Sequence, residues 1–157
     1  MQDLLDQLRH PLQSERLAAA RALDDVPQSP EVERALRDAA TTDPDAMVRK
    51  WSLHALICEH CKPDGVCSVD VIGTMVHALL HDRSVKVRTF AAGGLMWDRS
   101  GDQRVADAFG TVLATSPNRI LRERAAIFLA SQDVPRGERA HREWHPEWHA
   151  RIEELLA

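Results

Sequence analysis

The segment Asp82-Arg83-Ser84-Val85-Lys86-Val87-Arg88-Thr89-Phe90-Ala91-Ala92-Gly93-Gly94-Leu95 is the clearest of four similar segments in this chain. Its last nine residues align without gaps with Glu15–Leu23, Val48–Leu56 and Leu121–Leu129, and each copy has Arg second and Leu ninth. The four arginines are 33, 39 and 34 residues apart: Arg16, Arg49, Arg88 and Arg122. Similarity at such a period is typical of repeat proteins, whose units bury their apolar faces against their neighbours.

Each copy has the features of a helix that packs closely on its neighbours. A pair of small or apolar residues at its centre allows close approach: Ala19-Ala20, Ser52-Leu53, Ala91-Ala92 and Ala125-Ala126. Six residues before each Arg stands a capping-type position: His10, Asp43, Asp82 and Ser116. In three copies a proline follows, and we predict that it begins the helix in the first turn: Pro11, Pro44 and Pro117.

A second helix precedes each of these. We predict four partner helices: Met1–Arg9, Pro30–Ala40, Val69–His81 and Gln103–Ala114. Ser29-Pro30 is a cap followed by proline, and Glu31 and Glu33 stand where the helix dipole favours acids. No window keeps the alternation of a half-buried strand for long, and tyrosine is absent, so the chain is predicted to be all-α.

The pattern D-x-x-x-x-V-R-x-x-A-A-x-x-L resembles HEAT repeats, including the bacterial phycobilisome-lyase HEAT-like type, over about residues 10–131. The resemblance implies a right-handed α-solenoid of about four HEAT-like helix pairs in one domain, 1–157, with repeats at about 1–25, 30–61, 68–97 and 102–131 and a C-terminal helical cap at 136–157. It also implies that the second helix of each pair lines a concave face, where partners bind.

The shared arginine has a structural interpretation. Arg49, Arg88 and Arg122 are expected to stack as a ladder and to bond to acids such as Asp43, Asp45 and Asp82.

An insertion at residues 58–67 separates the second and third copies and carries all three cysteines. His54, Cys58 and Cys61 have the spacing of one helical stripe, and the turn Pro63-Asp64-Gly65 can bring Cys67 back to it. Three thiolates and one imidazole are a ligand set of structural zinc, so we predict one possible zinc site here. Three alternatives stay open: His60 as the fourth ligand, a thiol switch (Cys58–Cys61 or Cys61–Cys67), and unliganded buried cysteines.

Residues 136–157 leave the repeat pattern. His141, His145 and His149 are four residues apart, but Pro146 interrupts that stripe and is predicted to start a new helix that runs to Leu156. We expect this segment to cap the last repeat with its apolar side chains: Trp144, Trp148, Ile152, Leu155 and Leu156.

Composition restricts the function. The chain has 44% hydrophobic residues and a net charge of −4, from 20 basic and 24 acidic residues. This balance disfavours a general nucleic-acid binder, which needs a basic excess. The acidic N-terminal segment is unlike a signal peptide and no apolar run is long enough to span a membrane, so we expect a cytoplasmic protein.

No catalytic motif stands out, so we expect a non-enzymatic interaction module for a protein partner of unknown identity. Four residues at similar helix positions are candidates for the binding surface: Lys50, Trp51, Phe90 and Arg124. A metal- or redox-responsive regulatory module is the alternative. The resemblance also leaves open a DNA-glycosylase-like or bilin-lyase-like protein, and oligomeric state is undetermined.

Overall fold

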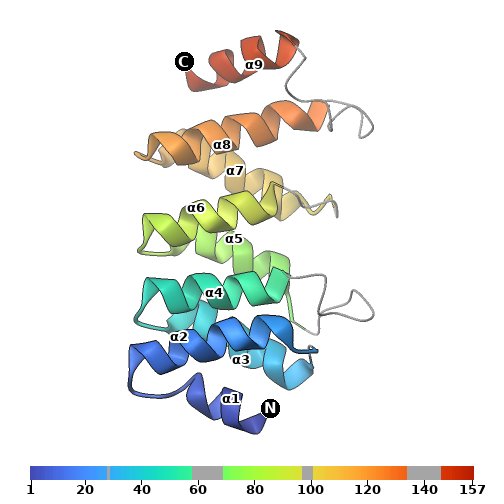
Figure 1. The fold of residues 1–157 in the computed structure, drawn as a ribbon. Coiled ribbons are helices and arrows are strands. Elements are labelled where there is room, and N and C mark those ends of the chain that lie inside the picture. Colours follow the sequence, from blue (N-terminus) through green and yellow to red (C-terminus); the bar gives the residue numbers. More distant parts are fainter. Residues whose placement is uncertain (28, 58–68, 97–100, 134–145) are drawn as a thin grey trace. The chain divides into compact units, whose positions relative to one another are not determined.

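The computed structural model describes residues 1–27, 29–57, 69–96, 101–133 and 146–157, and every regular element in these ranges is a helix (Figure 1). The α-helices are α1 Gln2–Gln7, α2 Gln13–Ala22, α3 Pro30–Thr42, α4 Ala46–Ile57, α5 Val71–His81, α6 Val85–Leu95, α7 Gln103–Thr115, α8 Arg119–Ala130 and α9 Pro146–Leu156. Two 3₁₀ turns, η1 Leu23–Asp25 and η3 Ser131–Asp133, follow α2 and α8. The all-α prediction is confirmed for this part of the chain.

The helix positions agree closely with the sequence. Helices α1, α3, α5 and α7 are the four predicted partner helices, and α2, α4, α6 and α8 carry the four repeat copies. The Ser29 side chain accepts a hydrogen bond from the Val32 N–H, with Pro30 in the first turn of α3, as predicted. Helix α9 begins at Pro146 and ends at Leu156, also as predicted.

The starts of the repeat helices were predicted wrongly by two residues. Helices α2, α4 and α8 begin at Gln13, Ala46 and Arg119, so the three prolines precede the helix rather than occupy its first turn. The reason is a turn that recurs in all four copies. The capping-type side chain accepts the backbone N–H two residues later: Leu12 N–H to His10 Nδ1, 3.1 Å; Asp45 N–H to Asp43 Oδ1, 2.8 Å; Ser84 N–H to Asp82 Oδ1, 2.7 Å; and Asn118 N–H to Ser116 Oγ, 3.2 Å.

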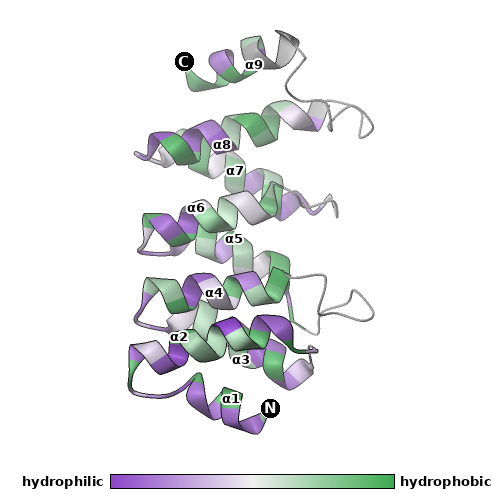
Figure 2. Cartoon of the chain, viewed as in Figure 1, coloured by the Kyte–Doolittle hydropathy of each residue, from purple (hydrophilic) through white to green (hydrophobic). Residues whose placement is uncertain are grey.

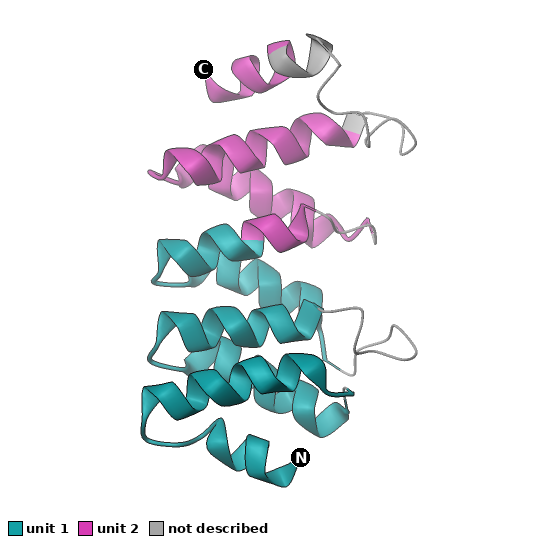
Figure 3. Ribbon diagram, viewed as in Figure 1, with its two compact units in different colours: residues 1–91 teal, residues 92–157 magenta. Residues whose placement is uncertain are grey.

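The chain forms two compact units, residues 1–91 and 92–157 (Figure 3). In the first unit α2 packs on α4, α3 packs on α5, and α3 and α4 join these two layers. In the second unit α7 packs on α8, and α8 contacts α9, which is the predicted cap helix. Trp144 lies outside the described residues, as does the side chain of Trp148.

The core of each unit lies where the repeat pattern places it. All eight residues of the four central pairs are fully buried: Ala19, Ala20, Ser52, Leu53, Ala91, Ala92, Ala125 and Ala126. Larger apolar side chains from the partner helices complete the core, among them Leu36, Met75 and Leu79 in the first unit and Phe109 in the second. Hydrophobic and hydrophilic residues therefore alternate around the helices, as Figure 2 shows in green and purple. None of the described helices has the length and hydropathy needed to span a membrane.

Candidate functional site

The repeated arginine joins each helix pair of the first unit to the next. Arg16 donates from Nε to Asp43 Oδ2 at 2.7 Å and from Nη2 to Oδ1 at 3.2 Å. Arg49 makes the same two bonds to Asp82, at 2.7 and 2.9 Å. These side chains are nearly buried, with 3% of Arg49 and 6% of Asp82 exposed. Two parallel bonds between a guanidinium and a carboxylate fix both distance and orientation.

The remaining arginine nitrogen holds the turn of its own copy. Nη1 donates to the backbone carbonyl six residues earlier, which is His10 for Arg16 at 3.0 Å, Asp43 for Arg49 at 2.8 Å and Asp82 for Arg88 at 2.6 Å. Asp43 and Asp82 therefore have two roles. Each accepts the preceding arginine through its carboxylate and the following arginine through its carbonyl oxygen.

The arginines that form ion pairs in the structure are not the same set as in the predicted ladder. Arg49 pairs with Asp82 as expected, but the second pair is Arg16 with Asp43, and Arg122 is exposed. Asp45 has another role, because its carboxylate accepts the N–H groups of Met47 and Val48 at the start of α4. It is a helix cap, which its position just before Ala46 explains.

The hydrogen bonds between Arg49 and Asp82 shift the pKa of both groups. Burial by itself would raise the pKa of Asp82, but the hydrogen bonds from Arg49 and from the Ser84 N–H outweigh it and hold that pKa below its ordinary value. The hydrogen bond to Asp82 raises the pKa of Arg49. The pair therefore stays ionised throughout the neutral range.

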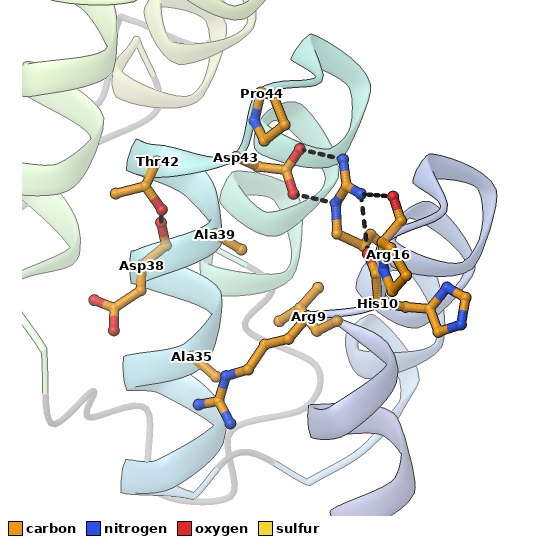
Figure 4. A pocket seen from close by; sticks show the side chains of 11 residues that line it. Arg9, His10, Arg16, Ala35, Asp38, Ala39, Thr42, Asp43 and Pro44 are labelled. Atoms are coloured by element: carbon orange, nitrogen blue, oxygen red, sulfur yellow. Dashed lines mark hydrogen bonds and ion pairs between the residues drawn. The ribbon is translucent and has the colours of Figure 1, made fainter.

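Each ion pair lines a pocket. The first pocket, about 420 Å³, lies between the start of α2 and the end of α3 and includes Arg16, Asp43, Arg9 and Ala35 (Figure 4). The second, about 260 Å³, includes Arg49 and Asp82 together with His77 and His81 of α5. In Figure 4 the polar atoms of Arg16 point to Asp43 and to the turn. The bonding capacity of Arg16 is thus taken up within the protein, so we interpret the first pocket as structural.

A different surface of the first unit brings together aromatic and cationic side chains from α2, α4 and α6. We call it the aromatic–cationic row: Arg21, Lys50, Trp51, His54 and Phe90. Arg21 lies over the Trp51 ring at 5.0 Å, and Lys50 lies over the Phe90 ring at 5.5 Å. The His54 ring centroid is 5.1 Å from that of Trp51 and 5.9 Å from that of Phe90. The five side chains form one continuous chain of contacts.

The row follows the repeat. Counted from the shared arginine, Trp51 and Phe90 are two residues later in their copies, while Arg21 and His54 are five residues later. The Arg21–Trp51 and His54–Phe90 contacts each join the later position of one copy to the earlier position of the next. The same pairing recurs within the second unit, where Nη1 of Arg124 would be 2.8 Å from a Cβ at Gly93. The absence of a side chain at Gly93 leaves room for this guanidinium.

The predicted binding residues are thus partly brought together. Lys50, Trp51 and Phe90 lie in the row and are half-buried, while Arg124 belongs to the second unit. Arg21 was not predicted as a member of the row, and His54 was predicted to be a zinc ligand or, with His60 in its place, an ordinary partly buried residue. Arg21 and His54 are both the fifth residue after the shared arginine, so a comparison of that position among the copies would have indicated both as members of the row.

The predicted zinc ligands lie mostly outside the described residues, as Cys58, Cys61 and Cys67 do. His54 is described: its Nδ1 lies 3.1 Å from Asp24 Oδ2, an ion-pair distance when the imidazole is protonated. The two atoms are not aligned for a hydrogen bond, and Nδ1 has no hydrogen-bond partner among the described residues. Within that part of the chain, no group of three or more His, Cys, Asp or Glu side chains could hold a metal.

No family model matches this chain, and neither the curated proteins nor the solved structures contain a significant match.

Proposed function

We propose that this chain is a short HEAT-like α-solenoid of about four helix pairs that acts as a non-enzymatic scaffold for a protein partner. The repeated turn and the repeated arginine bonds support the helical-repeat part of this proposal. The same turn occurs in four copies at similar sequence intervals, and the same bidentate pair occurs twice, at Arg16–Asp43 and Arg49–Asp82. Such regularity is the basis of stacking in repeat proteins.

The aromatic–cationic row is the observation that carries the interaction function. Trp51, His54 and Phe90 are neither packed into the core nor fully exposed, and they occupy adjacent second helices. Tryptophan and arginine are the residue types most enriched at energetically dominant positions of protein interfaces. A row of rigid rings with few rotatable bonds loses little conformational entropy on binding. An odd number of cysteines, three in the sequence, is not the pattern of a disulfide framework, which favours a partner in the cytoplasm.

Site-specific photo-cross-linking tests the proposal. A photo-reactive phenylalanine analogue would replace Lys50 in the row and, as the matched control, Arg34, an exposed basic residue of α3. We expect one partner to be cross-linked from position 50 in extracts of the source cells, and the purified partner to bind the wild-type chain but not Trp51→Ala. Equal capture from positions 50 and 34, or unchanged binding by Trp51→Ala, would contradict the proposal.

The second candidate is a metal- or redox-responsive module, in which His54 and the cysteines at 58, 61 and 67 bind one zinc ion. Its support is the ligand spacing in the sequence together with Asp24 Oδ2, 3.1 Å from His54 Nδ1, which a small rotation of the imidazole would bring into the hydrogen bond common to metal-binding histidines. Zinc content of protein purified without tag or added metal, compared with Cys58→Ser and Cys67→Ser, tests it. About one zinc per chain that both variants lose supports the site, whereas metal-free protein with three freely titrating thiols excludes it.

A further inference from the structure

Charge is divided unevenly between the helices of the first unit. Helices α2, α4 and α6 carry six basic residues against one acid, and all seven belong to the first unit: Arg16, Arg21, Arg49, Lys50, Lys86 and Arg88 against Glu15. Helices α1, α3 and α5 carry two basic residues and five acids. In the first unit, the helices that carry the row therefore have an excess of basic residues, and the other helices have an excess of acids.

Within the described residues, only part of this charge is paired with carboxylates. Asp43 and Asp82 balance Arg16 and Arg49. Arg21, Lys50 and Lys86 have no carboxylate partner in the described ranges, although Arg21 stands one helical turn before Asp25. One carboxylate lies beside the row, with Asp24 Oδ2 3.1 Å from His54 Nδ1. Cations without partners on one surface produce a positive potential that attracts anionic groups.

The aromatic rings position these cations for binding. A guanidinium that lies over an indole keeps the N–H groups at its edge free, and these can bind a carboxylate through two parallel bonds. Arg21 Cζ lies 5.0 Å from the Trp51 ring centroid, and the Lys50 ammonium, which can donate to a single carboxylate oxygen, lies 5.5 Å from that of Phe90. Because each side chain already has restricted freedom, less entropy is lost when it binds an anion.

We propose that the aromatic–cationic row binds an acidic segment of a protein partner, with carboxylates at Arg21 and Lys50 and apolar side chains against the ring edges between them. This inference rests on the proposed interaction function and specifies the chemistry of its partner. A peptide fits better than a nucleic acid for two reasons. The row offers a few cations between rings rather than a long basic stripe, and the acids on α1 and α3 oppose a long polyanion.

Fluorescence anisotropy with synthetic peptides tests the chemistry directly. The probe is a labelled 12-residue peptide in which glutamates and leucines alternate with serines, and its control has glutamine in place of every glutamate. We expect the wild-type chain to bind the glutamate peptide about tenfold more tightly than the glutamine peptide, with affinity that falls as salt rises. The double variant Arg21→Gln/Lys50→Gln should lose about tenfold in affinity, and Arg34→Gln/Arg37→Gln, which removes the same two positive charges from α3, less than twofold.

Three results would overturn the inference: equal binding of the two peptides or of neither, an unchanged affinity in the double variant, or tighter binding of a 20-base-pair DNA duplex than of the glutamate peptide. Circular dichroism and urea unfolding of the double variant establish that it is folded. Failure of this inference is distinguishable from failure of the proposed function. If the peptides fail but a partner is still cross-linked at position 50 and lost in Trp51→Ala, the interaction function stands and only the acidic chemistry is wrong.

Discussion

Arg49 holds Asp82, 33 residues away, with two hydrogen bonds of 2.7 and 2.9 Å between side chains that are almost completely buried. Arg16 holds Asp43 in the same manner. Breaking one partner of a buried pair leaves the other charge without compensation, which makes such pairs sensitive points of a fold even where their net contribution is small. Arg49 also donates to the turn before its own helix, so this one residue stabilises its own helix pair and bonds it to the next pair.

Removal of the acid should therefore destabilise the protein strongly. We expect Asp82→Ala to lower the free energy of unfolding by about 3 kcal/mol, because Arg49 would remain buried without its carboxylate. Asp38→Ala is the matched control, since the Asp38 side chain is 64% exposed and its ion pair among the described residues is with its neighbour Arg37. Its effect should be within about 0.5 kcal/mol. Urea unfolding followed by circular dichroism measures both, and equal losses would contradict the buried-pair interpretation.

The effect of Asp82→Ala should depend on pH. The folded-state pKa of Asp82 lies below its ordinary value, so its stabilisation is fully present above the unfolded-state pKa of about 4 and is lost as pH falls through the folded-state pKa. The difference in unfolding free energy between wild type and Asp82→Ala should thus be constant from about pH 7 to pH 5 and shrink below about pH 4. Urea unfolding at pH 7, 5, 4 and 3 measures it. A difference that is unchanged at pH 3 would mean that the carboxylate charge is not responsible.

The repeat arginines should differ in how much each contributes to the free energy of unfolding. Arg88 donates to the carbonyl of Asp82, as Arg16 and Arg49 do to the carbonyl six residues before them, but it forms no ion pair among the described residues. We expect Arg49→Ala to lower the free energy of unfolding by about 3 kcal/mol and Arg88→Ala by about 1 kcal/mol, the usual contribution of a single hydrogen bond. Thermal and urea unfolding of the two variants side by side would test this order. A loss in Arg88→Ala as large as that in Arg49→Ala would show that its charge is also paired.

The helices and the buried residues at the centre of each repeat helix could be predicted from the sequence, because they follow directly from a short repeated pattern. Ala19-Ala20 and Ala125-Ala126 are core residues for the same local reason, namely their register with a shared arginine and leucine. The partners of that arginine could not be predicted as well. Whether Arg49 reaches Asp43 or Asp82 depends on how one helix pair packs on another, and both acids have the same local sequence signature.

The row illustrates the same limit. Trp51 and Phe90 are recognisable as equivalent positions in their copies. The contact of Trp51 with Arg21, however, joins the fifth residue after the arginine of one copy to the second residue after the arginine of the next. This offset is a property of stacking and not of any single helix. The proline positions were predicted wrongly because the turn at residues such as Asp43 satisfies the backbone before the helix begins.

Gly93 is a glycine at a repeat position that carries a side chain in the other three copies, and the guanidinium of Arg124 lies where its side chain would be. Alanine is preferred to glycine inside a helix by about 1 kcal/mol, so Gly110→Ala in α7, where a Cβ would meet nothing within 4 Å, should raise stability by about that amount. Gly93→Ala should gain somewhat less, since its Cβ would be 2.8 Å from Nη1 of Arg124 and the end of this flexible side chain would have to move. In an Arg124→Ala background the obstacle is gone, and Gly93→Ala should then gain as much as Gly110→Ala. A double-mutant cycle in urea measures this coupling. If Gly93→Ala gains the same with and without Arg124, the guanidinium is not held over the glycine and the repeated offset contact does not extend to the second unit.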